Sequence, residues 1–283
     1  MKQHKPLIAV DGDSFAHRAF HALPKSIRRG DGGPAGLLVG MGNVLVRLWE
    51  EESPRAVVVA WDTLTVPTYR HVALESYQAG REFDAELLEQ LELAPQLCEA
   101  MGFATAKGGG YEADDFLAAA VASEEARGGR ALVASGDRDT FQLASEQTTI
   151  LQPQRGGGAF ARIGPVEVRE RYGVEPRQVP DFIALRGDPS DRIPGARGVG
   201  SKTAADLLRR HGGLEAALAE GRFEREAEAL RLYLRIATMD ATAPLPALGD
   251  QTPTWGRAAD LASDWGLARL AERLRALEAS SSS

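Results

Sequence analysis

Three short apolar runs, each followed by aspartate, constrain the fold of this chain more than any other feature. The runs and their acids are residues 7–10 before Asp11, residues 56–61 before Asp62, and residues 131–134 before Asp137 and Asp139. Continuous short apolar runs are typical of strands buried on both faces of a sheet. Sites in parallel sheets form at the carboxyl ends of the strands, so we expect these acids to gather at one edge.

Helical spacing between the runs indicates which kind of sheet they form. Apolar residues recur at helical intervals over residues 37–49, 85–101 and 112–127. Strands that alternate with helices form a mainly parallel sheet with helices on both faces. The sequence therefore predicts an α/β, Rossmann-like core over residues 1–164.

The pattern changes after Gly164-Pro165 to short helices separated by tight turns. The helices predicted there cover residues 166–172, 176–185, 202–210, 214–237 and 261–277. We therefore predict a second, helical module over residues 165–283.

Two further acidic clusters lie outside the strand ends. Glu112-x-Asp114-Asp115 opens a predicted helix, and Asp188-x-x-Asp191 lies in a turn-like segment. Taken singly, such acids have ordinary roles, because helix dipoles favour acids in the first turn and aspartate favours turns.

The acids have a different consequence if the fold brings them together. The nine are Asp11, Asp62, Glu112, Asp114, Asp115, Asp137, Asp139, Asp188 and Asp191. Two carboxylates about 4 Å apart repel by about 4 kcal/mol at an effective dielectric of about 20, so the group must take up protons or bind cations. Oxygen ligands without a nearby His or Cys pattern favour Mg²⁺ or Mn²⁺, and two such ions form a phosphoryl-transfer site.

Composition constrains the partners and the cellular compartment of this protein. A net charge of −7 argues against nucleic acid, but cations bound in an acidic site cancel that charge locally. The single cysteine, Cys98, excludes an intramolecular disulfide. The chain has neither a signal-peptide core nor an apolar run of bilayer length. We expect a cytoplasmic monomer with no membrane partner.

A glycine-rich stretch over residues 192–210 suggests a phosphate-binding hairpin. Its spacing differs from a P-loop, since Ser201 stands where the lysine belongs. Glycines allow a tight turn, and the next helix start offers free N–H groups to a phosphate. The stretch also carries a basic patch made of Arg192, Arg197, Lys202, Arg209 and Arg210. This pattern predicts a helix–hairpin–helix that binds duplex DNA without reading sequence, although an ordinary helix start with solvated basic side chains is the alternative.

These features resemble the 5′-nuclease (flap endonuclease) family, especially the domain that begins bacterial DNA polymerase I. The resemblance runs in unbroken order over roughly residues 5–245. The matching segments are Val10-Asp11-Gly12 with Arg18, Asp62 with Tyr69-Arg70-His71, Tyr77-Gln78-Ala79-Gly80-Arg81, Gly110-Tyr111-Glu112-Ala113-Asp114-Asp115, Ser135-Gly136-Asp137-Arg138-Asp139, and Gly187-Asp188-x-x-Asp191 leading into Gly198-Val199-Gly200-Ser201-Lys202-Thr203.

The resemblance implies a PIN-like nuclease core, a helix-three-turn-helix module, and a helical arch over about residues 66–93, through or under which the 5′ strand passes. It assigns Arg70, Arg81 and Tyr77 to catalysis, with both arginines facing phosphate. The implied first metal group is Asp11, Asp62, Glu112 and Asp114. The implied second group, which would contact its ion directly or through water, is Asp115, Asp137, Asp139, Asp188 and Asp191. The implied DNA-binding residues are Arg18, Arg192, Arg197, Gly198, Gly200, Ser201, Lys202 and Thr203, with a K⁺ ion in the hairpin.

The function implied is that of a stand-alone structure-specific 5′-3′ exonuclease or flap endonuclease in DNA replication and repair. It hydrolyses phosphodiester bonds near DNA 5′ ends with two or more Mg²⁺ or Mn²⁺ ions. Two positions depart from the family. Gln78 stands where relatives commonly have lysine, and Arg192 stands where they usually have asparagine.

Two other functions are compatible with parts of the sequence. A haloacid-dehalogenase-like phosphatase would use Asp11-x-Asp13 as nucleophile and acid, but it leaves Glu112, Asp114 and the hairpin without a role. A structure-specific DNA-binding protein with weak or no catalysis is the non-enzymatic alternative, suggested by Gln78.

Overall fold

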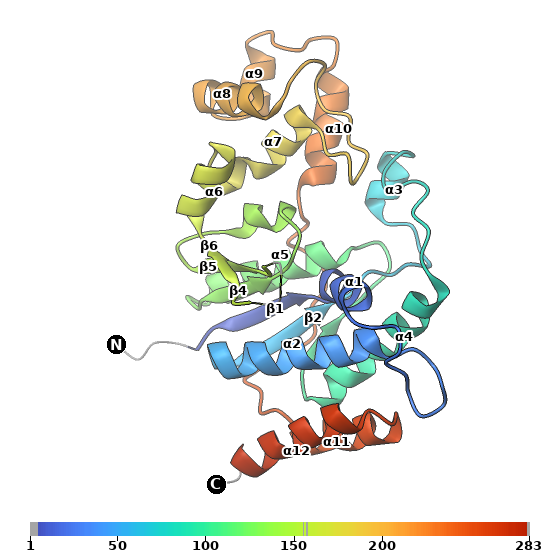
Figure 1. Cartoon of the computed structure of the whole chain (residues 1–283). Helices are drawn as coiled ribbons and strands as arrows, with labels where there is room; N and C mark the ends of the chain where they lie inside the picture. The colour runs from blue at the N-terminus through green and yellow to red at the C-terminus, as the bar shows by residue number, and fades with distance from the viewer. Residues whose placement is uncertain (1–4, 155, 157, 282–283) are drawn as a thin grey trace.

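The computed structural model describes residues 5–154, 156 and 158–281, which form a six-stranded sheet between two helical layers (Figure 1). The strands are β1 (Leu7–Asp11), β2 (Ala56–Ala60), β3 (Ala104–Ala106), β4 (Ala131–Ala134), β5 (Thr148–Gln152) and β6 (Ala161–Ile163). Their order is β3-β2-β1-β4-β5-β6, and all neighbours are parallel except the antiparallel pair β5–β6. The predicted mainly parallel α/β fold is confirmed.

Three of these strands, β3, β5 and β6, lie outside the predicted set. The sequences of β3, Ala-Thr-Ala, and of β6, Ala-Arg-Ile, are too short for a recognisable period. They become strands because each pairs with an established neighbour, β2 or β5.

Helices cover both faces of the sheet. Their bounds are α1 Gly12–Ala22, α2 Gly36–Glu52, α3 Tyr69–Ala73, α4 Ala85–Ala100, α5 Ala113–Ala126, α6 Pro165–Tyr172, α7 Val179–Arg186, α8 Ser201–His211, α9 Leu214–Ala219, α10 Ala227–Ala237, α11 Trp255–Asp264 and α12 Ala268–Ser281, with 3₁₀ turns η1 Asp139–Leu143 and η2 Pro176–Gln178.

Alternation along the strands divides the core in two. In β1, Ile8 and Val10 belong to the core cluster that includes α1, α2, α4, α11 and α12, whereas Leu7 and Ala9 belong to the cluster that includes α5 and the helices from α6 to α10. All four side chains are fully buried, as expected for a strand between two helical layers. The two clusters together bury the sheet and hold the carboxyl ends of its strands in fixed relation.

The last two helices differ from the predicted division at residue 164. Instead of extending the helical module, α11 and α12 pack below α2 and α4, so Trp255 joins the core cluster of Trp49 and Phe103 (Figure 1). The preceding segment is fastened to the sheet, because the Gln251 side chain bonds both the N–H and the carbonyl of Val57. The helical module therefore ends with α10.

Two predicted long helices are each broken by a left-handed residue. Residues 214–237 divide into α9 and α10 around Gly221, which has φ 79°. Residues 261–277 lie in α11 and α12, and Gly266 with φ 73° ends the first of these. A Cβ at position 266 would lie 2.7 Å from the Gly30 nitrogen, so this turn needs glycine.

Strands β2 and β3 are added on one side of β1, and β4, β5 and β6 are added on the other side. The strand order therefore reverses between β1 and β4, whose carboxyl ends carry Asp11 and the Asp137 segment. Such a switch point is the usual location of sites in open α/β sheets. The described residues contain no helix that is both long and apolar enough to cross a membrane.

Candidate metal centre

Asp11 is placed by the junction of β1 and α1. It is the N-cap of α1, where its Oδ1 accepts the N–H of Ser14 at 2.9 Å, and its Oδ2 accepts the hydroxyl of Ser135 after β4. The carboxylate therefore links the two central strands at the switch point.

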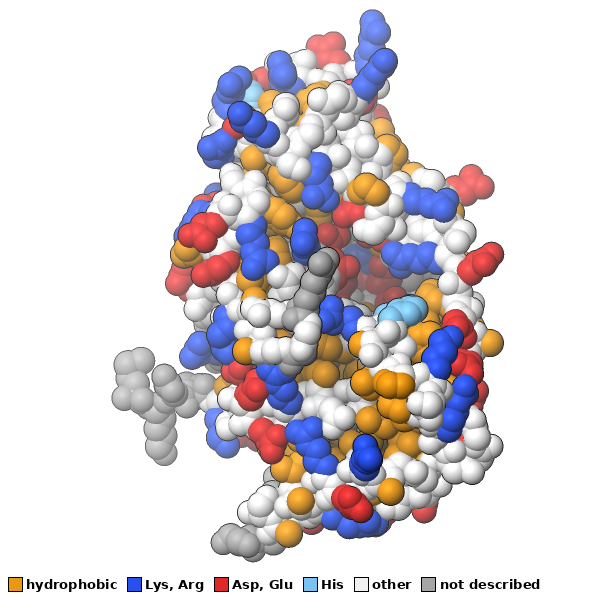
Figure 2. Space-filling model, viewed as in Figure 1, with side chains coloured by type: hydrophobic (Ala, Val, Ile, Leu, Met, Phe, Trp, Pro, Cys, Tyr) orange, Lys and Arg blue, Asp and Glu red, His pale blue; other side chains and the backbone are white. Residues whose placement is uncertain are grey.

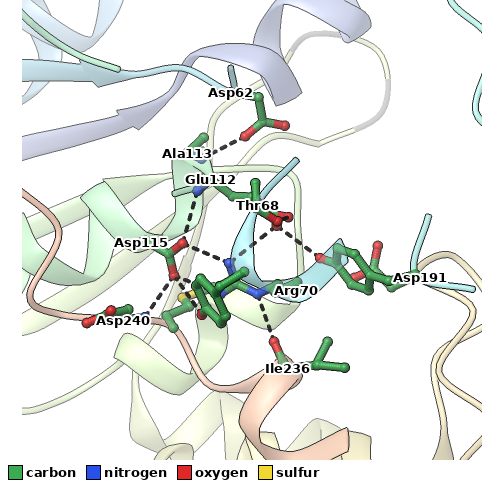
Figure 3. Close-up of polar contacts among 12 residues, drawn as sticks. Asp62, Thr68, Arg70, Glu112, Ala113, Asp115, Asp191, Ile236 and Asp240 are labelled. Carbon is green, nitrogen blue, oxygen red and sulfur yellow. Dashed lines mark hydrogen bonds and ion pairs between the residues drawn. The ribbon is translucent and has the colours of Figure 1, made fainter. Parts of the chain in front are cut away.

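Asp62 and Glu112 join β2 to the start of α5. The Oδ1 of Asp62 accepts the N–H of Ala113 at 2.7 Å, and Glu112 accepts the hydroxyls of Thr68 and Tyr77, each at 2.9 Å (Figure 3). These bonds aim both carboxylates toward the same space at the edge of the sheet.

The second group of acids lies on turns. The N–H of Asp139 bonds Oδ1 of Asp137 at 2.9 Å, which shapes the turn after β4. Asp188 lies in the turn after α7 and accepts the N–H of Ser190 at 2.8 Å. Asp191 accepts the amide of Gln78 at 3.1 Å and so contacts the segment between α3 and α4.

These elements enclose a cavity of about 580 Å³. Figure 2 shows acidic side chains gathered in a hollow near the centre of the molecule. Eight of the nine predicted acids line the cavity, together with one further carboxylate that the nuclease hypothesis did not include. The nine lining acids are Asp11, Asp13, Asp62, Glu112, Asp114, Asp137, Asp139, Asp188 and Asp191.

Asp115, the ninth predicted acid, does not line this cavity. It is fully buried and forms two 2.7 Å bonds with the guanidinium of Arg70. In this structure Asp115 and Arg70 are committed to each other and neither lines the cavity, so the arrangement does not support the predicted roles of Asp115 in the second metal group and of Arg70 as a phosphate-facing cation. Arg70 is only 3% exposed.

The other two residues predicted to act in catalysis do line the cavity. Tyr77 is buried and donates its hydroxyl to Glu112, and Arg81 bonds Oδ1 of Asp191 at 2.9 Å. Gln78 lies between them and donates its amide to Tyr77 and Asp191. This short segment therefore contacts both predicted metal groups.

Asp13 is the functional candidate that the sequence reasoning missed for a nuclease. Its Oδ2 accepts the N–H of Asp62 at 2.7 Å, so it holds the end of β2. The pattern Asp11-x-Asp13 is visible in the sequence, where it fits a phosphatase motif. His17, one turn further along α1, also lines the cavity.

The chemistry of this donor set fits divalent cations. Burial raises the pKa of Asp11 to about 7, and burial also raises the pKa of Glu112 to about 7. The pKa of Asp114 lies well above its usual value because of burial, and the charges of Asp137, Asp11 and Asp139 raise it further. Cations would remove this electrostatic cost.

Several of the acids are held by internal partners instead of converging. Asp191 pairs with Arg81, Glu112 with Tyr77, and Asp188 with Ser190. Among the residues that the structure describes, no three His, Cys, Asp or Glu side chains already stand where they could hold a metal ion. Metal binding therefore requires these side chains to change partners.

A pH prediction follows from the raised pKa values of Asp11 and Glu112. Unfolded carboxyls titrate near pH 4, so between about pH 4 and pH 7 the folded state binds more protons than the unfolded state. The free energy of unfolding of metal-free protein should then fall as pH rises through this window, by on the order of 5 kcal/mol for both groups. Melting in EDTA should occur on the order of 10 °C lower at pH 8 than at pH 5.

The matched variant for this melting experiment is Asp11→Asn with Glu112→Gln, which removes two of the titrating groups and should reduce the pH dependence, while the raised pKa of Asp114 keeps part of it. Saturating Mg²⁺ should raise the melting temperature of the original chain more at pH 8 than at pH 5. A metal-free protein that is equally stable at both pH values would contradict the predicted destabilisation.

The predicted hairpin lies beyond the acidic cavity, between α7 and α8. Gly198 has φ 75°, and Gly200 is the N-cap of α8. Ser201, Lys202 and Thr203 form the exposed first turn of α8, where N–H groups have no intrahelical partner. A helix–hairpin–helix arrangement is present, with α7 as its first helix.

The arginines predicted to bind DNA have different neighbours in the structure. Arg192 has φ 56° and lies against Gly80, where a Cβ would stand 3.3 Å from its Nη2. Arg197 is exposed near Glu226, and Arg18 lies on α1, where it bonds the carbonyl of Gln154 at 3.2 Å.

Comparison with known proteins finds two adjoining family models. The 5′-3′ exonuclease N-terminal resolvase-like domain matches residues 6–173, and the 5′-3′ exonuclease C-terminal SAM fold matches residues 174–254. DNA polymerase I of Mycobacterium tuberculosis is 39% identical over 210 residues, which are 74% of this chain and 23% of the polymerase. The thermostable DNA polymerase I of Thermus thermophilus is 36% identical over 250 residues, covering 84% and 29%. The chain thus spans about a quarter of the length of these relatives.

Solved structures share the fold at low identity. T5 5′-exonuclease with bound divalent metal ions (zinc) has a TM-score of 0.69 and 19% identity, over 95% of this chain and 97% of that one. The catalytic core of Rad2 in complex with DNA substrate has a TM-score of 0.62 and 12% identity, over 96% and 91%.

Proposed function

This chain belongs to the 5′-3′ exonuclease family, and we propose that it hydrolyses phosphodiester bonds near the 5′ ends of DNA as an exonuclease and flap endonuclease. The observation that carries this proposal is that nine carboxylates line one cavity at the carboxyl ends of the strands. We place the activity in DNA replication and repair, where such 5′ ends arise, and expect a cytoplasmic monomer.

The cavity residues form two adjoining groups that would each hold a divalent cation. Asp11, Asp62, Glu112 and Asp114 form the first, and Asp137, Asp139, Asp188 and Asp191 form the second. We propose Mg²⁺, or Mn²⁺ in its place, because all the donors are oxygen atoms. Two such ions, when bound, activate water and stabilise the attacking and leaving oxygens.

Side chains of the α3–α4 segment prepare the cavity for a phosphate. Arg81 is 42% exposed and lines both the acidic cavity and an adjacent cavity of about 650 Å³ beneath α3. Asp62 and Tyr77 also line both, so the two cavities adjoin. We propose that the 5′ strand enters through the second cavity and that Arg81 leaves Asp191 to contact its phosphate.

The hairpin supplies binding energy that does not depend on the reaction. The free N–H groups of Ser201, Lys202 and Thr203 suit a phosphate oxygen of the duplex backbone. Backbone carbonyls of the hairpin suit K⁺, which we propose as a further ligand there. Phosphate contacts carry no sequence information, so we expect DNA binding to be independent of sequence. Rad2 and T5 D15 flap endonuclease have been solved with DNA, which supports the choice of partner.

The experiment that tests the function is incubation of a 5′-labelled flap duplex with Mg²⁺. We expect release of short labelled products, with cleavage stopped by EDTA. Nicked and blunt duplexes in parallel measure the balance of exonuclease and endonuclease cutting. A flap that is bound tightly yet uncut at every Mg²⁺ and Mn²⁺ concentration would favour the DNA-binding alternative, and an aspartyl-phosphate on Asp11 would favour the phosphatase.

Lys202→Ala should weaken binding to any duplex, because Lys202 is exposed in the first turn of α8 and suits a phosphate contact. We expect affinity to fall several-fold and the slope of log affinity against log salt to decrease by about 1. Fluorescence anisotropy over a salt series measures both.

The control for Lys202→Ala is Arg269→Ala, an exposed cation on α12 at the opposite end of the molecule (Figure 1). It should leave the salt slope unchanged. An equal change in both variants would point to general electrostatic attraction in place of a hairpin contact.

A further inference from the structure

Arg70 and Asp115 form a buried ion pair beside the acidic cavity. Nη1 and Nη2 of Arg70 each lie 2.7 Å from an oxygen of Asp115, and Nε donates to the carbonyl of Ile236 at 2.8 Å (Figure 3). The guanidinium thus connects α3, the first turn of α5 and the end of α10.

The remaining acceptor capacity of Asp115 is also used. Its Oδ2 accepts the N–H of Glu112 at 3.0 Å, and its Oδ1 accepts the N–H of Asp240 at 2.8 Å. The carboxylate is therefore saturated by donors from its own helix start, from Arg70 and from the segment after α10. This saturation explains why it is turned away from the cavity.

The first turn of α5 is the part of the metal centre that this pair controls. Glu112 is its N-cap and Asp114 lies within it, and both line the cavity. Asp115 holds the backbone of Glu112, and Arg70 also lies 3.5 Å from a side-chain oxygen of Glu112. A rotation of this turn would move two carboxylates of the first metal group together.

Net stabilisation is a poor explanation for such a pair. The desolvation of two buried charges offsets much of their attraction, and well-packed apolar residues of similar volume are often as stable. What the pair does provide is direction, because a two-pronged guanidinium–carboxylate contact fixes both angle and distance.

We infer that Arg70 and Asp115 are a positioning pair, which holds the first turn of α5 so that Glu112 and Asp114 face the metal ions. This inference rests on the proposed function, since that function requires the ions. It replaces the sequence-based roles of Arg70 at phosphate and of Asp115 at metal.

The test compares two neutralised ion pairs on the same helix. Arg70→Gln with Asp115→Asn removes the charges at the start of α5 and leaves polar groups of similar size. Arg55→Gln with Glu124→Gln is the matched control near the other end of α5, where Arg55 bonds Glu124 at 3.0 Å and the carbonyl of Leu248 at 2.7 Å. Both variants should lose stability, because each replaces a charged pair on α5 by neutral polar side chains.

The readout is the affinity for Mn²⁺ of DNA-free protein, measured by titration calorimetry at a temperature where circular dichroism shows each variant folded. We expect affinity to fall 10- to 100-fold in the Arg70–Asp115 variant, as is typical when a residue that orients a ligand is lost. The Arg55–Glu124 variant should keep the affinity of the original chain. Equal affinities in all three proteins, or equal losses in both variants, would overturn the inference.

Arg70→Lys provides the conservative variant if the neutral pair does not fold. Lysine keeps the positive charge but cannot form the two-pronged contact with the carboxylate. The Mn²⁺ affinity of this variant should therefore fall several-fold, less than in the neutral pair. Unchanged Mn²⁺ affinity in this variant would overturn the positioning role. The proposed function would still stand if the original chain cut the flap. Failure of the original chain to bind Mn²⁺ or to cut would instead reject the proposed function.

Discussion

Replacing Asp114 by alanine is expected to abolish cleavage of a 5′ flap while leaving binding of the DNA intact. Asp114 lines the cavity, and its pKa is raised by burial and by Asp137, Asp11 and Asp139, so it lies close to acids of both groups. Its loss removes a metal ligand from the centre of the site. We expect the single-turnover rate to fall at least about 1,000-fold, because metal ions supply the nucleophile and stabilise the transition state.

Binding should survive this change because the hairpin lies on a different module from Asp114. Anisotropy in Ca²⁺ should give a dissociation constant within a few-fold of the original chain. Asp139→Ala should behave in the same way, since Asp139 also lines the cavity. The control is Asp260→Ala, whose side chain is 79% exposed on α11 and which should cut normally. Cleavage at the original rate by Asp114→Ala would refute the metal assignment.

Arg81→Ala is expected to lower the rate of flap cleavage by about 100-fold or more at saturating Mg²⁺ and DNA. Arg81 is the predicted phosphate-facing cation that does line the cavity, and its guanidinium reaches the edge of the second metal group at Asp191. Removing one preoriented donor from a site of charge development costs on the order of 100- to 1,000-fold in rate. Arg81 must give up its contact with Asp191 before it contacts the phosphate. Its loss should therefore lower the cleavage rate more than the DNA affinity.

Arg28→Ala is a matched control for Arg81→Ala. The Arg28 side chain is 40% exposed, against 42% for Arg81, and it also pairs with a carboxylate, that of Glu86 at 2.8 Å. It lines neither cavity beside the metal centre. Rapid-quench measurements on the three proteins should show a slow reaction only for Arg81→Ala. Equal rates for both variants would show that the site does not use the Arg81 cation.

Most of the fold could be predicted because its signals are local. The apolar runs that precede Asp11, Asp62 and Asp137 are typical of buried strands. The helical spacing between them predicts that these strands are parallel. The short strands β3 and β6 could not be predicted, since their pairing depends on neighbours that are distant in sequence. The packing of α11 against α4 depends equally on where the chain returns after residue 240.

The acidic site was predicted from residue type and order, and the structure brings eight of its nine acids to one cavity. Asp115 does not line the cavity, which could not be foreseen because sequence shows charge but not direction. It follows Asp114 by one position, and adjacent residues on a helix point about 100° apart. Asp114 therefore faces the cavity while Asp115 faces Arg70. Asp13 was not predicted for the nuclease site, because the pattern Asp11-x-Asp13 does not reveal its contact with Asp62 after the neighbouring strand β2.

The sequence by itself determined that acids would gather at the ends of parallel strands, because apolar periodicity decides which segments are buried and where they stop. Only the tertiary structure decided which acids face a common space and which are neutralised by a buried partner. The physical reason is that a carboxylate in a folded chain is directed by its nearest donors. For Asp115 those donors are Arg70 and the N–H of Asp240, from segments far away in sequence.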